Sequence, residues 1–123
     1  FMTKRENAEK LIVTYGRISG NAIEAVDNLE NTALIVLNRI KPLPEKAVEI
    51  IRSKKEVYFF EESLKSGGIG EKLGSSLLEI GFKGKYRITA VNDEFVKQAS
   101  VSELLSEYSL DRDSMIKIVN GEM

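Results

Sequence analysis

Hydrophobic positions along the chain fall into short β-branched runs that alternate with stretches of helical periodicity. These runs predict four strands, over Lys10–Tyr15, Thr32–Leu37, Glu56–Phe60 and Tyr86–Val91. The first run is closed by Gly16, and its unbroken apolar character is typical of a strand buried on both faces. The short mixed stretch Phe1–Glu6 is interpreted as a small antiparallel edge strand that turns back at Asn7-Ala8.

Amphipathic stretches follow these runs and predict helices. The predicted helices cover Ser19 to about Glu30, Glu45–Ser53, the segment from the glycines at 67–70 to Gly81 and Gly84, Val101–Tyr108, and about Arg112–Val119. Ser19, Ser100 and Asp111 are the candidate N-caps. Pro44 is well placed at the first turn of a helix, where a missing amide hydrogen costs nothing.

The order strand, helix, strand, helix is the pattern of a parallel sheet with covering helices, because parallel neighbours need a crossover connection. We therefore predict one three-layer α/β/α domain over residues 1–123. The aromatic run Tyr58–Phe60 is expected to lie mostly in the core, since a central strand alternates between two helix layers.

Composition excludes several classes of function. The 123 residues are 42% hydrophobic and 30% charged, with a net charge of −1, which fits a soluble globular domain and gives no basic footprint for nucleic acid or an anionic membrane. No apolar run is long enough to span a bilayer, and the polar start is not a signal peptide. We expect a cytoplasmic protein without nucleic-acid or membrane partners.

The chain contains no cysteine and no histidine. Thiolate nucleophiles, disulfides, imidazole acid–base catalysis and Cys/His metal sites are therefore excluded. We predict no catalytic residue and no metal ligand in this chain.

One candidate site remains, for a small anion at the carboxyl ends of the strands. It combines the backbone amides of Gly67, Gly68 and Gly70, at the start of a predicted helix, with Arg17 and Glu61 at two strand ends. The glycine spacing matches neither the dinucleotide fingerprint nor a P-loop. We favour a structural role for these glycines, as a tight turn and a close packing contact.

Glu61 and Glu62 follow one another at the carboxyl end of the predicted strand Glu56–Phe60. Adjacent strand residues point to opposite faces, so the two carboxylates are not expected to form an acid–base pair. The favoured alternative is that one of them accepts hydrogen bonds from the amides of the glycine segment. Arg17 is equally well explained by a surface salt bridge.

Four segments in order resemble the C-terminal domain of the transketolase superfamily, and most closely that of the 1-deoxy-D-xylulose-5-phosphate synthase family. They are LIVTYGRISGNAIEAVDNL (11–29), VLNRIKPLPE (36–45), VYFFEESLKSGGIGEKLGSSLLE (57–79) and NDEFVKQASVSELLSEYSLDRDSMIKIV (92–119). In the last segment, Asp93, Phe95, Leu110 and Asp111 stand on matching positions. No single motif is specific, but four in the correct order over more than 100 residues are specific together.

The resemblance implies a mostly parallel five-stranded mixed sheet with an antiparallel edge strand. It also implies a parent enzyme that condenses pyruvate with glyceraldehyde 3-phosphate using thiamine diphosphate and magnesium. Family cofactor and substrate residues lie in the two preceding domains, so this domain is expected to bind no cofactor and to serve domain packing and homodimer contacts. The start at Phe1, with Met2 second, is interpreted as an expression artefact or the cut end of a longer protein.

This sequence departs from the family pattern in two places. Ser63 stands where the family commonly has histidine, and Gln98-Ala99 stand in place of His-Gly. The alternatives are therefore the C-terminal domain of a transketolase or of a 2-oxoacid dehydrogenase β-type subunit, or a free-standing small-anion-binding module.

Overall fold

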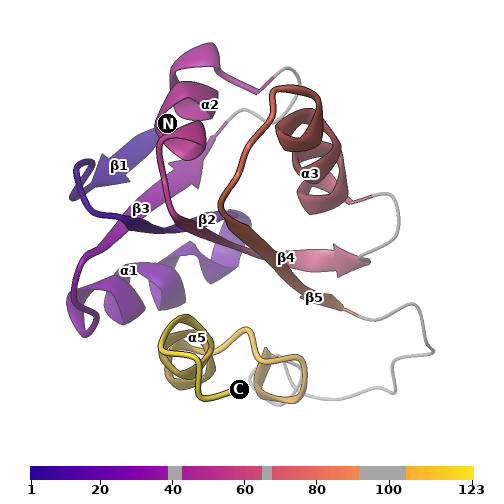
Figure 1. Ribbon diagram of the computed structural model, residues 1–123. Helices are drawn as coiled ribbons and strands as arrows, with labels where there is room; N and C mark the ends of the chain where they lie inside the picture. The colour runs from indigo at the N-terminus through magenta and orange to yellow at the C-terminus, as the bar shows by residue number, and fades with distance from the viewer. Residues whose placement is uncertain (39–42, 65–67, 92–104) are drawn as a thin grey trace.

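The computed structural model describes residues 1–38, 43–64, 68–91 and 105–123 (Figure 1). One sheet of five strands runs through the centre in the order β1-β3-β2-β4-β5. The strands are β1 (Met2–Lys4), β2 (Lys10–Tyr15), β3 (Thr32–Leu37), β4 (Glu56–Leu64) and β5 (Lys85–Val91). β2 pairs in parallel with β3 and with β4, and β5 pairs in parallel with β4. The predicted central strands are confirmed.

β1 confirms the antiparallel edge strand. Its three residues pair antiparallel with β3, with Thr3 opposite Ile35. After β1 the chain turns through Arg5, whose φ of 50° is left-handed, and the Ala8 amide donates to the Arg5 carbonyl at 2.9 Å. After this tight turn the chain enters β2, which lies on the other side of β3 from β1.

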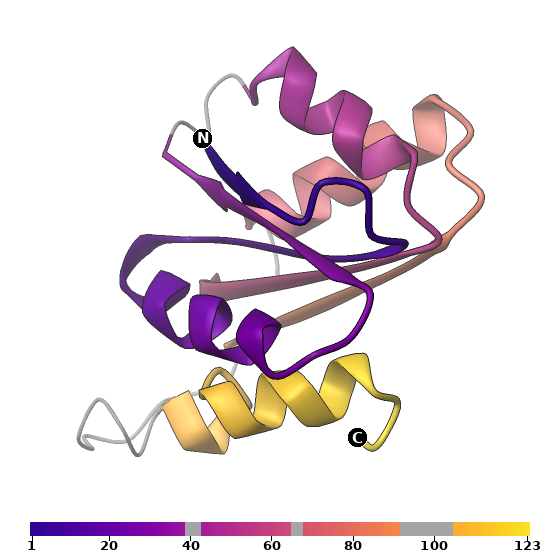
Figure 2. The same cartoon turned by 90° about the vertical axis from the view of Figure 1, so that its left-hand side faces the viewer.

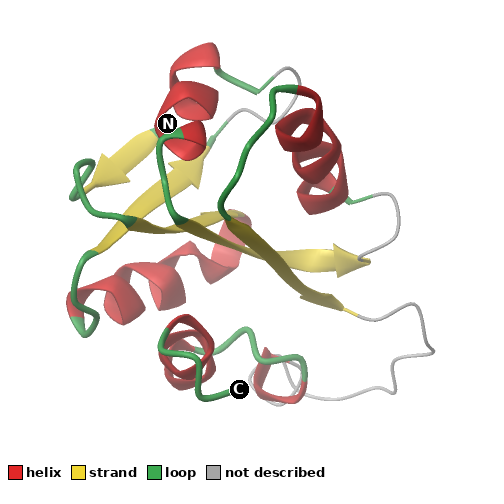
Figure 3. Ribbon diagram, viewed as in Figure 1, coloured by secondary structure: helices red, strands yellow, loops and turns green. Residues whose placement is uncertain are grey.

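Helices cover both faces of the sheet and make three layers (Figures 1 and 2). They are α1 (Ser19–Asp27), α2 (Glu45–Arg52), α3 (Ile69–Glu79) and α5 (Arg112–Val119). α2 and α3 lie on one side of the sheet, and α1 and α5 lie on the other (Figure 3). The three-layer α/β/α architecture is therefore as predicted.

The alternation of β2 and β4 builds two separate cores. On the α2 and α3 side, Val13 and Phe59 are fully buried, and on the α1 and α5 side Ile12 and Phe60 are fully buried. Because strand side chains alternate between faces, a strand covered by helices on both sides is apolar at most of its positions. All three aromatic residues of Tyr58–Phe60 are at most 1% exposed, which confirms their expected place in the core.

The ends of several elements differ from the sequence prediction. α1 ends at Asp27 rather than near Glu30, because the chain must leave the helix to begin β3 beside β2 at Thr32. Ser19 is not an N-cap: a 3₁₀ turn, η1 (Gly16–Ile18), leads directly into α1, so Ser19 already has helical φ and ψ. β4 extends beyond Phe60 to Leu64, with a register irregularity between these residues. The first half of the predicted helix Val101–Tyr108 lies outside the described residues, as does its cap Ser100, and residues 105–107 are helical.

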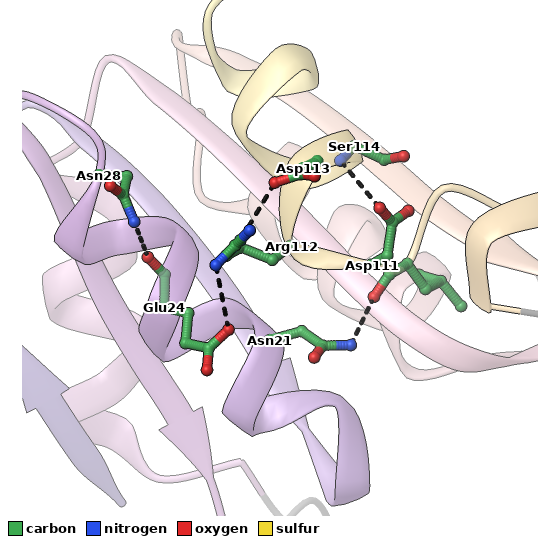
Figure 4. Close-up of polar contacts among 8 residues, drawn as sticks. Asn21, Glu24, Asn28, Asp111, Arg112, Asp113 and Ser114 are labelled. Carbon is green, nitrogen blue, oxygen red and sulfur yellow. Dashed lines mark hydrogen bonds and ion pairs between the residues drawn. The ribbon is translucent and has the colours of Figure 1, made fainter. Parts of the chain in front are cut away.

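α5 begins where predicted, and its first turn is joined to α1 by polar contacts (Figure 4). Asp111 caps the helix by accepting from the Ser114 amide at 3.4 Å. Asn21 of α1 donates to the Leu110 carbonyl at 3.1 Å, and Glu24 lies 3.8 Å from Arg112. The polar contacts flank an apolar one, because Leu110 and Met115 are at most 1% exposed against α1. Together they hold the C-terminal helix against the sheet.

No helix among the described residues has the length and apolar character needed to cross a membrane.

Candidate functional site

The carboxyl ends of β2 and β4 lie side by side and carry most of the residues of the candidate site. Thr14 of β2 is opposite Phe60 of β4. The next residues of the two strands, Tyr15 and Glu61, therefore follow at the same end of the sheet. The buried Thr14 hydroxyl donates to the Phe60 carbonyl at 2.8 Å and ties these ends together. Immediately beyond, Gly16 adopts a φ of +79°, which lets the chain leave β2 and enter η1.

Glu61 is completely buried, and three donors converge on its carboxylate. The Tyr15 hydroxyl donates to Oε2 at 2.8 Å. The backbone amide of Ile69 donates to Oε2 at 3.2 Å, and that of Gly70 donates to Oε1 at 3.1 Å. A buried carboxylate needs such partners, because leaving its charge unpaired in the interior would be very costly. The predicted contact between a carboxylate and the glycine segment is therefore present.

These two amides belong to the first turn of α3. The first amides of any helix lack intrahelical partners, and the N-cap residue of α3, Gly68, has no side chain to satisfy them. Glu61 supplies that function from the neighbouring strand and also places a negative charge at the positive end of the helix dipole. The site thus contains a helix cap that comes from a tertiary contact.

Gly70 is required by the closeness of this contact. A Cβ at position 70 would lie 3.0 Å from Oε1 of Glu61 and 3.2 Å from side-chain atoms of Phe59 and Ile88. Only glycine lets the first turn of α3 approach the sheet to this distance. The structure therefore supports the structural interpretation of this glycine.

Tyr86 of β5 closes the far side of the turn. Its hydroxyl donates to the Gly70 carbonyl at 2.6 Å. Burial, and secondly the negative charge of Glu61, raises the pKa of Tyr86 far above its ordinary value. The phenol therefore stays protonated and keeps its donor role over the whole physiological range.

Arg17 and Glu62 form a separate pair on the surface. Arg17 Nε donates to the two carboxylate oxygens of Glu62 at 2.8 and 2.6 Å, and Nη2 also donates to Oε2. The hydrogen bond with Glu62 raises the pKa of the Arg17 guanidinium, which is already charged at any physiological pH. Glu61 points into the protein while Glu62 points to the surface pair, so the two carboxylates have separate partners, as predicted.

The structure thus divides the predicted site residues between two contacts. Glu61 and Gly70 meet, while Arg17 binds Glu62 instead. Gly68 precedes α3 as its N-cap, and Gly67 lies outside the described residues. An anion at the Ile69 and Gly70 amides would have to displace the Glu61 carboxylate. The anion site stays a proposal.

Sequence reasoning did not identify Tyr15 and Tyr86. Tyr15 has a readable signal, since it stands at the end of a central strand directly before the turn glycine. Tyr86 has none, because its position against α3 depends on β5 pairing next to β4. Both tyrosines donate to groups at the cap. In the described ranges, no group of three or more acidic residues could hold a metal ion.

Comparison with known proteins shows similarity over nearly the whole chain. Residues 1–115 match the family described as "Transketolase, C-terminal domain". The 1-deoxy-D-xylulose-5-phosphate synthase of Clostridium beijerinckii is 34% identical over 115 residues, covering 88% of this chain and 18% of the synthase. The synthase of Natranaerobius thermophilus is 30% identical over 125 residues, covering 96% of this chain and 20% of that protein. The chain therefore spans about a fifth of the length of these curated relatives.

A solved structure shares the fold. It is described as "Split gene transketolase, inactive beta4 tetramer", and it superposes with a TM-score of 0.80 at 24% sequence identity. The match covers 94% of this chain and 39% of that one. At this identity the likeness concerns the fold alone.

The Glu61 cap predicts a large difference between two neighbouring substitutions. Glu61→Gln keeps the shape of the side chain but removes its charge. Its NH2 group would face one of the three donors that the carboxylate now accepts from, so the free energy of unfolding should fall by about 2–3 kcal/mol. Glu62→Gln affects only the exposed pair with Arg17 and should cost much less. Urea unfolding of both variants measures the difference, and equal losses would contradict the assigned roles.

The anion proposal has its own test. Phosphate and a phosphate ester are titrated into labelled protein while the amide signals of Gly68 and Gly70 are followed by NMR, with Gly121 near the C-terminus as the reference. Binding at this site predicts saturable shifts at Gly68 and Gly70 that Arg17→Gln weakens. Signals that move no more than that of Gly121 would remove the proposal.

Proposed function

Because the chain belongs to the transketolase C-terminal domain family, we propose that it is the C-terminal, non-catalytic domain of a thiamine-diphosphate-dependent transferase resembling 1-deoxy-D-xylulose-5-phosphate synthase. The observation that carries the proposal is the match over residues 1–115 together with synthase relatives at 30–34% identity. The parent enzyme condenses pyruvate with glyceraldehyde 3-phosphate, with loss of carbon dioxide, on the way to isoprenoids, thiamine and pyridoxal.

The residues of this domain support a role without chemistry. The chain has no histidine or cysteine, and Glu61, the one fully buried carboxylate among the described residues, is engaged by three donors as a helix cap. Among the described residues, no group of three or more acidic side chains could hold a metal ion. From the family resemblance we assign thiamine diphosphate and magnesium to the preceding domains of the parent.

The role left for this domain is assembly. Its sheet is covered on both faces by its own helices, so the sheet edges, helix surfaces and strand ends are what it can offer to other domains. We propose that these surfaces contact the preceding domains of the parent and a second copy of it. Domains placed in this way fix the relative position of catalytic groups that they do not supply.

A domain exchange tests the proposal. The C-terminal segment of the Clostridium beijerinckii synthase is replaced by residues 1–123, and synthesis from pyruvate and glyceraldehyde 3-phosphate is assayed with thiamine diphosphate and magnesium. We expect the chimera to exceed the synthase lacking this segment by roughly a hundredfold, because displacement of reacting groups by an ångström costs about that factor.

Two controls make the result specific. Thiamine diphosphate binding and sedimentation show whether each protein is folded and assembled, independently of turnover. A folded, cofactor-loaded chimera without synthase activity would contradict the proposal. If the same domain instead restored a truncated transketolase, the transketolase alternative would replace it.

A further inference from the structure

Among the described residues, β5 is the outermost strand on one side of the sheet. β5 is the last strand in the sheet order, and in the described part of the chain no strand pairs with its outer side. β1, next to Phe1, forms the opposite edge. Unpaired backbone groups on a strand edge are a template for pairing with another chain.

Grooves of different character flank this edge on its two faces. On the α3 side a groove of about 470 Å³ is lined mainly by apolar residues, among them Leu77, Leu78, Phe82, Tyr86 and Ile88. On the α5 side a smaller groove of about 240 Å³ is lined mainly by polar groups, among them Arg87, Thr89 and Glu107. Among the β5 residues, Tyr86 lines only the apolar groove, Arg87 and Thr89 line only the polar one, and Ile88 lines both.

Exposed apolar side chains lie beside the apolar groove. Leu78 is 81% exposed, and Ile80 at the end of α3 is 40% exposed. They are two of the four large hydrophobic residues that are exposed among the described residues. An apolar lip next to an open strand edge is typical of a protein–protein contact.

We propose that two copies of the chain pair through β5, antiparallel, about a twofold axis at Ile88. This inference deepens the proposed assembly function and rests on it. A second copy is the occupant because β5 is complementary to itself. With Ile88 opposite its own copy, all seven residues of β5 pair, and Tyr86 lies opposite Ala90.

Charge and side-chain alternation favour this register over the alternative registers of the β5 pair. In the register centred on Ile88, Arg87 lies opposite Thr89 and Lys85 opposite Val91, so no like charges face each other directly. A one-residue slip would place apolar side chains opposite the polar face. Moving the axis to Arg87 would set two guanidinium groups opposite each other, and moving it to Thr89 would leave Lys85 without a pair in β5.

The same axis brings the exposed leucines together. A twofold axis perpendicular to the sheet keeps α3 of both copies on one face, so Leu78 and the apolar groove of one copy face those of the other. An isologous contact of this kind closes on itself and produces a dimer with one continuous ten-stranded sheet rather than a fibre.

Single cysteines test the register directly, because the chain contains none of its own. Directly opposite residues in antiparallel strands have Cα atoms about 4.5–5.5 Å apart, which lies within the range of a disulfide. Ile88→Cys is oxidised alone, and Arg87→Cys is oxidised in a mixture with Thr89→Cys. In an antiparallel pair, one of these two residue pairs is hydrogen-bonded and the other is not, and their Cα separations differ. One of the two pairs therefore has the better geometry for a disulfide.

The opposite edge supplies the matched control. Thr3→Cys places an exposed thiol at the centre of β1, where it would link two copies only if they paired through that edge. In a glutathione buffer we expect Ile88→Cys, or the Arg87→Cys and Thr89→Cys mixture, to form the dimer roughly tenfold faster than Thr3→Cys, because pairing raises the local thiol concentration. Arg87→Cys alone should link poorly, since its thiols are not opposite.

The outcomes separate this inference from the assembly function. Failure of both β5 pairs, or equal linking by Thr3→Cys, would overturn the β5 interface. If the unaltered chain still sediments as a dimer in that case, assembly through another surface stands. The domain exchange with the synthase tests the proposed function independently of either result.

Discussion

The structure depends on the contact between the Glu61 carboxylate and the first turn of α3. β4 is followed along the chain by the helix α3, and the first backbone amides of any helix need hydrogen-bond acceptors from outside the helix. Here the acceptor comes from the preceding strand, with Tyr15 fixing the carboxylate from β2 and Tyr86 fixing the turn from β5. One buried charge therefore joins three strands and one helix.

This arrangement explains why the most suggestive chemistry in the sequence is structural. A strand-end carboxylate followed by glycines has the form of a ligand site in an open α/β sheet. In this chain the glycines bring the helix close enough for the protein's own carboxylate to take the place that a bound anion would occupy. The absence of histidine and cysteine from the sequence and the family membership both support the proposal that the domain serves assembly.

Local patterns predicted most of the fold, and tertiary contacts decided the rest. Thr32–Leu37 and Lys10–Tyr15 were predictable because a strand buried on both faces is apolar at most positions, and Asp111 because an N-cap acts within its own turn. Ser19 was misassigned because η1 precedes α1, which no local pattern indicated. The partners of Glu61 were only half predictable, since Tyr86 reaches the cap through the strand order. Gln98-Ala99 lie outside the described residues.

The central claim is that Glu61 is a permanent internal cap for α3 and not a group held ready for a ligand. Native-state hydrogen exchange at Ile69 and Gly70 measures this most directly, since both amides donate to Glu61. The account predicts that they exchange as slowly as the buried amides of β4 and open only with global unfolding. Exchange at the rate of an exposed helix end would contradict it.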